Sequence, residues 1–212
     1  MPNVSNVRVY GLAEAIRAAK YPKAVELDSL TAELTKGIKA CLNCPTGEGH
    51  DNALNGIIVQ FDLTFSQKAW VELQRYHFID FVSSCSTMHK LQNMNPRLQC
   101  NRYVDPRTID VLQEKIDEYN RLLKAKKEQG FAITDEELKR ARLEMLYNIP
   151  SGFELTAAMT TNYRQLKTIY QQRRNHLLPD WKCMCDWIET LPRFMELTQK
   201  NYKTMLDKSK QI

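Results

Sequence analysis

The sequence predicts an α+β fold in which helices pack on a small β-sheet. Residues 59–65 alternate between apolar and polar side chains, as a half-buried strand does. Several other segments carry apolar residues at helical spacing and are bounded by capping residues or proline. Strands and helices do not alternate regularly, so a parallel βαβ sheet is not expected. No linker is long enough to divide the 212 residues, and we predict a single domain over residues 1–212.

The first 50 residues predict a strand, two helices and a loop, which lie at residues 6–10, 11–20, 28–40 and 43–50. The first of these helices should stop at Tyr21, because Pro22 disfavours the α conformation of the residue before it. The second has Leu30, Leu34 and Ile38 on one face. Proline and glycine mark the loop.

The next helix is predicted to begin after the strand at 59–65. Ser66 can cap it, and a helix over residues 66–78 would place Trp70, Leu73 and His77 near one face. The following residues are β-branched, aromatic or small, which leaves open whether the helix continues toward Ser86.

The second half of the chain predicts four helices and a strand, with the helices at residues 105–130, 134–148, 162–177 and 179–208 and the strand at residues 153–160. Asp105 as cap and Pro106 in the first turn start the first of these helices. Thr134 and Glu137 form a capping box for the second.

Composition limits the class of protein. A net charge of +5 permits an anionic ligand, nucleotide or nucleic acid, but requires neither. No apolar run reaches the roughly 20 residues that span a bilayer. The first residues lack a signal peptide's basic start and apolar stretch, so we expect a cytoplasmic protein with no membrane partner and with its six cysteines reduced.

Metal binding is not expected. Cys41 and Cys44 have the two-residue spacing of zinc ligands, but Cys183 and Cys185 are separated by one residue and belong to an amphipathic helix. No Walker loop and no Rossmann glycine pattern is present.

Three polar clusters are candidates for chemistry. Residues 49–52 (GHDN) end the loop before the strand and favour a turn in which Asp51 bonds local backbone, although His50 could meet a ligand. Residues 74–90 contain Arg75, His77 and several hydroxyl side chains. This combination suits phosphate binding, or a nucleophile paired with His77. The alternative interpretation is that the apolar residues of this segment simply pack in the core.

The third cluster covers residues 162–176. Arg164 and Lys167 share a helix face, and Arg173 and His176 follow about two turns beyond Lys167. An anionic ligand would meet several donors here. A solvated basic face near a helix C-terminus is the alternative interpretation.

In order and spacing, these clusters resemble the flavin-dependent thymidylate synthases. That family has a Gly-His segment before a strand, and then Arg-His-Arg, seven residues, Ser, one residue and Arg. Here the aligned residues are Tyr76-His77-Phe78, seven residues, and Ser86-Thr87-Met88. The family's later Asn-x-Arg and its following Arg correspond to Asn162-Tyr163-Arg164 and Arg173.

The resemblance implies a fold, ligands and an assembly. The fold would be a small, mostly antiparallel sheet flanked by helices, and the protein a homotetramer. Its ligands would be FAD and deoxyuridine monophosphate. The reaction would transfer a one-carbon unit from methylenetetrahydrofolate to C5 of the pyrimidine with NADPH as reductant, as part of nucleotide biosynthesis.

The resemblance also assigns residues to roles. The cofactor-binding positions are His50, His77, Asn162 and Arg164. The substrate-binding positions are Gln74, Arg75, Ser84, Ser86 and Arg173. Ser86 and His77 are the candidate catalytic residues.

Three departures suggest a second function. Tyr76, Phe78 and Met88 stand where the family has arginine, and Met88 cannot replace a bidentate Arg–phosphate contact. A catalytically inactive or repurposed nucleotide-binding protein on the same fold is therefore the alternative. Nucleic-acid binding through the basic residues at 124–127 and 140–142 ranks last, because no reader motif accompanies them.

Overall fold

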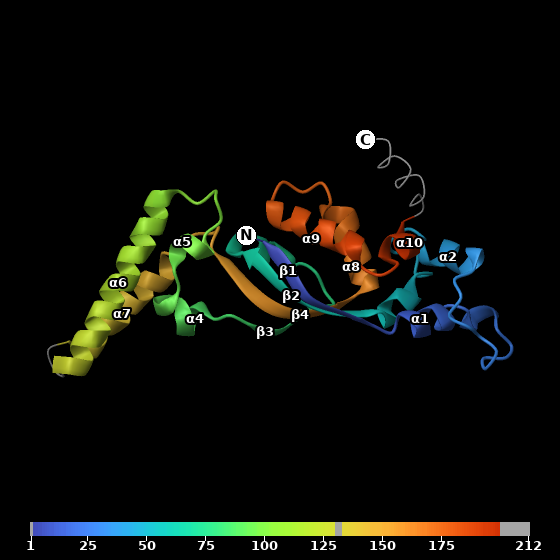
Figure 1. The fold of residues 1–212 in the computed structure, drawn as a ribbon, viewed down its shortest axis with the longest axis horizontal. Helices are drawn as coiled ribbons and strands as arrows, with labels where there is room; N and C mark the ends of the chain where they lie inside the picture. The colour runs from blue at the N-terminus through green and yellow to red at the C-terminus, as the bar shows by residue number, and fades with distance from the viewer. Residues whose placement is uncertain (1, 130–132, 200–212) are drawn as a thin grey trace. The chain divides into compact units, whose positions relative to one another are not determined.

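A computed structural model describes residues 2–129 and 133–199 of the chain (Figure 1). Its one sheet has four strands in the order β1-β2-β4-β3. The strands are β1 (Asn3–Tyr10), β2 (Ile58–Ser66), β3 (Ile79–Ser84) and β4 (Glu154–Asn162). This architecture confirms the α+β prediction.

The central strands β2 and β4 run antiparallel. The Tyr163 amide donates to the Ile57 carbonyl at one end of the pair, and the Gln67 amide donates to the Phe153 carbonyl at the other. Between these ends, the hydroxyls of Thr64 and Thr156 lie 2.7 Å apart. The start of β2 therefore lies beside the end of β4, and the end of β2 beside the start of β4. The two strands run in opposite directions, which confirms an antiparallel pair at the centre of the sheet.

The chain divides into two compact units. Unit 1 comprises residues 1–3, 64–74 and 83–157, and unit 2 comprises residues 4–63, 75–82 and 158–212. Strands β2 and β4 contribute residues to both units, so the division does not follow the element boundaries. The single-domain expectation stays a prediction.

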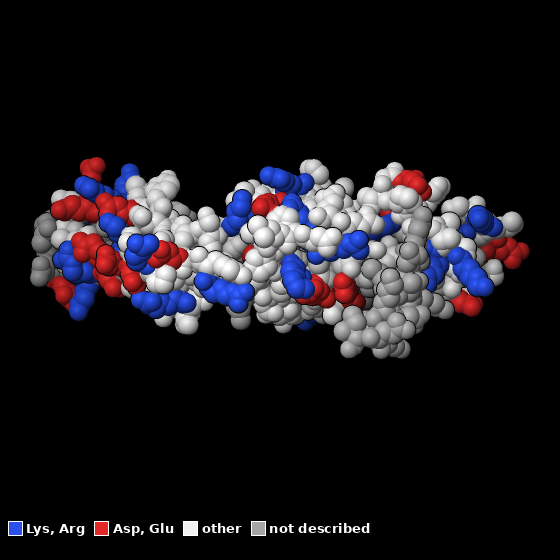
Figure 2. Space-filling model, turned by 90° about the horizontal axis from the view of Figure 1, so that it is seen from above, with Lys and Arg blue, Asp and Glu red and all other residues white. Residues whose placement is uncertain are grey.

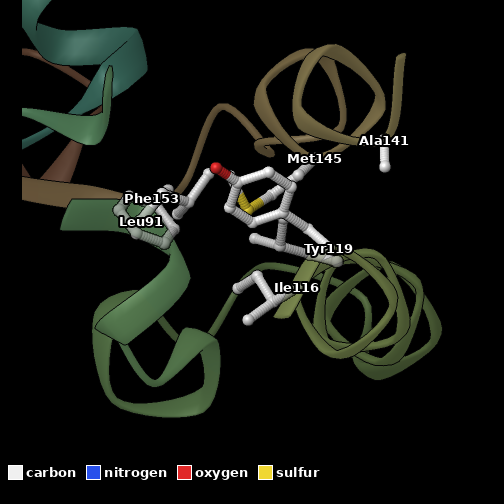
Figure 3. Close-up of a cluster of buried hydrophobic side chains, with 7 residues drawn as sticks. Leu91, Ile116, Tyr119, Ala141, Met145 and Phe153 are labelled. Atoms are coloured by element: carbon white, nitrogen blue, oxygen red, sulfur yellow. The ribbon is translucent and has the colours of Figure 1, made fainter. Parts of the chain in front are cut away.

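Unit 1 contains a helical hairpin built on an apolar cluster. Its helices are α3 (Gln67–Leu73), α4 (Thr87–Lys90), α5 (Pro96–Gln99), α6 (Pro106–Gln129) and α7 (Asp135–Tyr147), with the 3-10 turn η3 (Leu91–Asn93). Figure 3 shows side chains of α6 and α7 meeting Leu91 and Phe153. The cluster consists of Leu91, Leu112, Ile116, Tyr119, Ala141, Met145 and Phe153. The apolar stripes of the two helices thus pack on each other.

Unit 2 contains the remaining helices. They are α1 (Leu12–Ala18), α2 (Lys36–Leu42), α8 (Tyr163–Arg173), α9 (Pro179–Thr190) and α10 (Phe194–Thr198), with the 3-10 turns η1 (Tyr21–Lys23) and η2 (Asn52–Gly56). The ring of Phe61 on β2 lies 4.5 Å from that of Trp187 on α9. The Tyr163 hydroxyl donates to the Pro192 carbonyl and ties α8 to the turn before α10.

Three predicted helices differ from the structure. The helix expected at 28–40 exists only as α2, which begins after Thr35 because the Thr35 hydroxyl accepts from the Ile38 amide. Val25 and Leu27 ahead of it are exposed and pack in no core. The helix expected at 66–78 ends at Leu73, so His77 does not share its face.

The last predicted helix breaks at Thr190. The chain turns at Leu191 and Pro192, and α10 follows as a separate short helix. The remainder of that prediction, residues 200–208, lies outside the described residues.

The surface of the α6–α7 hairpin carries both signs of charge (Figure 2). Lys115 and Arg140 both pair with Glu144, and Lys124 pairs with Glu128. These pairs mix both signs of charge on the surface of the hairpin. No helix among the described residues has the length and apolar character needed to cross a bilayer.

Candidate functional site

A pocket of about 390 Å³ opens in unit 2 beside the first turn of α8. It is lined by Thr46, Gly47, Asn55, Phe78, Asn162, Arg164, Gln165 and Thr168. The loop before β2, the turn before β3 and the start of α8 therefore contribute to one cavity. Two residues predicted to bind the cofactor, Asn162 and Arg164, lie in this wall.

Asn162 has a local structural role at the pocket. It is the N-cap of α8, and its side-chain oxygen accepts from the Gln165 amide at 2.9 Å. This bond satisfies one of the free amides of the first helical turn. The side-chain oxygen of Asn162 is used in this bond, and its side-chain NH₂ can donate to a ligand.

Asp51 holds two cations of α8. Its carboxylate accepts from Arg164 Nε at 2.9 Å through one oxygen and from Lys167 Nζ at 2.7 Å through the other. Both Asp51 and Lys167 are buried. The prediction that the Asp51 side chain bonds local backbone in a turn is therefore wrong, because its carboxylate bonds two residues of α8.

Lys167 joins three segments of unit 2. Beyond Asp51, its ammonium donates to the carbonyls of Leu42 at 3.1 Å and Cys44 at 2.7 Å. The three donors of a lysine ammonium thus meet three acceptors. Lys167 is a buried anchor for the loop after α2, and the solvated basic face considered for it is wrong.

This arrangement orients Arg164. Asp51 fixes its Nε edge, and no described residue accepts from its terminal nitrogens. Asp51, Arg164 and Lys167 together carry a formal charge of +1. The pocket wall thus presents a positioned guanidinium with excess positive charge, which suits an anionic or strongly accepting ligand group.

Arg173 lies in an aromatic cradle near the end of α8. Its guanidinium lies 4.6 Å from the ring centre of Trp181 and 5.5 Å from that of Tyr76. Its Nε donates to the Tyr76 hydroxyl at 2.7 Å. His176 also contacts Trp181, with ring centres 6.2 Å apart. A sequence search for charged motifs missed the contributions of Tyr76 and Trp181 to this cluster.

The other predicted site residues of unit 2 are exposed. His50 follows Gly49, whose φ of 81° is the left-handed conformation that glycine favours. Arg75 and His77 lie in the turn between α3 and β3. The next residue, Phe78, has a φ of 59°, uncommon for a residue other than glycine, and its exposed ring lines the pocket.

Three predicted residues belong to unit 1. Gln74 is the C-cap of α3, Ser84 ends β3, and Ser86 precedes α4 with its carbonyl accepting from the Lys90 amide. Ser86 and Cys85 are in a different unit from His77, so either nucleophile pair stays a prediction.

Arg142 is a basic residue of unit 1 that the predicted site did not include. It reaches from α7 and donates to the Met88 carbonyl at 2.7 Å. The chain thus brings a guanidinium to the backbone of a position where the resembling family has arginine. Met88 is 54 residues from Arg142 along the chain, so no local sequence pattern predicts the contact.

No metal centre emerges from the described part of the chain. No three His, Cys, Asp or Glu side chains gather there as ligands would. Burial, with help from Asp186 and Glu189, raises the pKa of the Cys185 thiol to about 12. A metal-binding cysteine must be a thiolate, and this shift opposes that form.

Comparison with solved structures identifies the architecture. A structure of Thymidylate Synthase X (ThyX) from Helicobacter pylori with FAD and dUMP superposes with a TM-score of 0.60 at 15% identity, over 95% of this chain and 99% of that one. The fold is that of the flavin-dependent thymidylate synthases. A second structure of the Helicobacter pylori enzyme, complexed with FAD and dUMP, gives 0.57 at 16% identity, over 94% and 98% of the two chains.

A third similar structure is the UMP/dUMP methylase PolB from Streptomyces cacaoi, bound with 5-Br dUMP. It has a TM-score of 0.60 at 15% identity and covers 98% of this chain and 94% of its own. No protein-family model and no curated protein matches the sequence. The resemblance that the motifs indicated is thus confirmed for the fold.

Proposed function

We propose that this protein is a divergent flavin-dependent nucleotide methyltransferase that binds FAD and a deoxyuridylate-like nucleotide. One observation carries the proposal: on a thymidylate synthase-type fold, the Asn-x-Arg motif lies at a pocket with Arg164 held by Asp51. The reaction would transfer a one-carbon unit from methylenetetrahydrofolate to C5 of the pyrimidine, with NADPH as reductant.

The pocket beside α8 would hold part of the cofactor. Its volume is near the small end of ligand pockets, which suits one portion of a dinucleotide. Arg164 and the amide group of Asn162 would donate to it, and His50 and His77 are the other proposed cofactor-binding residues. FAD would supply the hydride chemistry, and the protein would orient the flavin and exclude water.

Arg173 would bind the nucleotide phosphate. Guanidinium groups bind phosphate bidentately, and this one is positioned by aromatic rings. Gln74, Arg75, Ser84 and Ser86 are the other proposed substrate-binding residues. Ser86 and His77 are the proposed catalytic residues.

A titration with FAD and dUMP tests the proposal. Purified protein should be yellow or should quench FAD fluorescence on mixing, and dUMP should then raise the melting temperature further. Arg164→Gln should weaken FAD binding about tenfold or more, whereas Arg107→Gln on the exposed start of α6 should not. Failure of the wild-type protein to bind either ligand would contradict the proposal.

One observation favours the alternative, a nucleotide-binding protein without flavin chemistry. Phe78, at a position where the family has arginine, is 71% exposed and lines the pocket. An aromatic ring can stack on a base where a guanidinium would bind phosphate. Binding of dUMP without FAD, and no methyl transfer with methylenetetrahydrofolate and NADPH, would support this alternative.

We also propose that the chain assembles with copies of itself, as a homotetramer. The strand β3 is at an edge of the sheet, and its Phe81 and Val82 are more than half exposed. Apolar side chains on an open edge favour association. A second copy is the partner that the resemblance implies.

A further inference from the structure

We propose that Thr161 holds Phe78 as a fixed platform on which the planar heteroaromatic ring of the ligand stacks. This inference rests on the proposed function, in which the pocket beside α8 holds part of the cofactor or the nucleotide. It assigns a positioning role to Thr161, which is not among the predicted site residues. Three features carry it: the backbone of Phe78, one buried hydrogen bond, and the groups that line the same pocket.

Phe78 is exposed in a backbone conformation that its side chain disfavours. Its φ of 59° lies in the left-handed region, where a Cβ crowds the backbone and glycine is favoured. The residue is 71% exposed, so little burial of its ring compensates for this conformation. Backbone strain at a residue whose ring is not packed in the core points to a function for that ring.

Thr161 fixes this conformation from the end of β4. Its hydroxyl donates to the Phe78 carbonyl at 2.7 Å, and Thr161 is only 4% exposed. The next residue, Asn162, is the N-cap of α8. Two successive residues of β4 therefore hold two parts of the pocket wall, the turn before β3 and the start of α8.

The ring of Phe78 and two donors line the same pocket. Phe78, Asn162 and Arg164 all belong to the wall of the cavity of about 390 Å³. Asp51 accepts from Arg164 Nε at 2.9 Å and so orients the guanidinium. An aromatic face binds a flat ring by stacking, and guanidinium and amide groups donate to acceptors on the edge of that ring. A flavin ring and a pyrimidine base both combine a flat face with edge acceptors.

Titrations with FAD and, separately, with dUMP test the platform. Phe78→Gly removes the ring and suits the left-handed backbone. It should weaken binding of the ligand that stacks there by about 5- to 100-fold without lowering the melting temperature. Phe78→Tyr, which restores a planar ring, should restore the binding. Phe78→Leu keeps an apolar side chain without a planar face, and it should bind nearly as weakly as Phe78→Gly.

Thr161→Val tests the positioning role. It keeps the β-branched shape and removes the hydroxyl, so it should weaken binding of the same ligand about 3- to 10-fold, the value of one hydrogen bond. Thr161→Ser restores the donor and should restore the binding. Because Thr161 acts through Phe78, adding Thr161→Val to Phe78→Gly should cause no further loss. The same loss in both backgrounds would overturn the positioning role.

Thr160→Val and Tyr103→Leu are the matched controls. Thr160 is the neighbour of Thr161 on β4, so its side chain points to the other face of the sheet. Tyr103 is an aromatic residue that is 66% exposed and does not line this pocket. Both variants should bind FAD and dUMP like the wild-type protein. Circular dichroism and the melting temperature show whether each variant is folded.

The outcomes separate this inference from the proposed function. If Arg164→Gln loses FAD binding but Phe78→Gly and Thr161→Val bind both ligands normally, the platform is wrong and the cofactor pocket stands. If Phe78→Gly weakens binding of dUMP but not of FAD, the platform stands and the assignment of this pocket to the flavin is wrong. If the wild-type protein binds neither ligand, both are wrong. A lower melting temperature together with weaker binding in Phe78→Gly would indicate a packing role and would also overturn the inference.

Discussion

The buried pair of Asp51 and Lys167 shows how single residues define the pocket wall. Each side chain is only 1% exposed, so neither charge is stabilised by bulk water. Lys167 is satisfied by Asp51 and two carbonyls, and Asp51 also accepts from Arg164. Such a pair contributes little net stability compared with apolar residues, but loss of one partner strands the other charge. The role of this pair is therefore to hold α8 against the end of α2 and the loop that contains Asp51.

Lys167→Met should lower the free energy of unfolding by about 3–5 kcal/mol, because Asp51 and two carbonyls lose their buried donor. Urea denaturation of the full chain measures the change. Lys182→Met is the control, since Lys182 pairs with Asp186 at the exposed surface of α9 and should cost less than about 1 kcal/mol. Similar losses for both variants would contradict the anchoring role.

Residue roles were predictable only where the partner is local. The caps Ser66 and Thr134 bond backbone three residues away, and the sequence identified both. Lys167 and Asp51 are 116 residues apart, and Tyr76 and Arg173 are 97 apart. Only the fold brings such pairs together, so motif spacing indicated the polar clusters without their internal contacts.

Ionised carboxylates contribute to the helical hairpin of α6 and α7. Hydrogen bonds from Lys115 and then Arg140 lower the pKa of Glu144 below its ordinary value. Bonds from the backbone and hydroxyl of Thr134 likewise lower the pKa of Glu137. A lowered pKa means that folding favours the charged form.

Acid should therefore weaken this element. The contribution of Glu137 and Glu144 is complete above the unfolded pKa of Glu, about 4.3, and is lost as the pH falls through their lower folded values. The urea concentration at the unfolding midpoint should thus decrease as the pH is lowered from about 5 to about 3. Glu144→Gln should reduce this dependence, and Glu136→Gln, which removes no ion pair that the described residues make, should not. An unchanged slope in Glu144→Gln would refute the assignment.

Elements with explicit end signals were predicted well. Pro106 and the Thr134 capping box fixed the starts of α6 and α7, and the alternation of β2 fixed a strand. The segment at 28–40 had a helical stripe, but its Leu30 and Leu34 are only half-buried, and only its end, from Lys36, is helical. Periodicity predicts a helix only where tertiary packing buries its face.

At the scale of the whole molecule, the edge strand β3 of the sheet exposes apolar side chains. Phe81 and Val82 are neighbours on β3, so their side chains point to opposite faces of the sheet, and they are 52% and 63% exposed. Both faces of the sheet therefore carry an exposed apolar side chain at this edge. Exposed apolar strand edges are sites of association, and lysine on an edge opposes it.

The proposed assembly predicts a molar mass near four times the 24.7 kDa of the chain. Sedimentation at several concentrations measures it. Phe81→Lys and Val82→Lys together should shift the protein toward smaller species, because two charges would be buried without partners. Leu177→Lys, at a side chain that is 95% exposed outside β3, should leave the mass unchanged. A wild-type mass of 24.7 kDa at every concentration would show that the open edge of β3 does not bind a second copy.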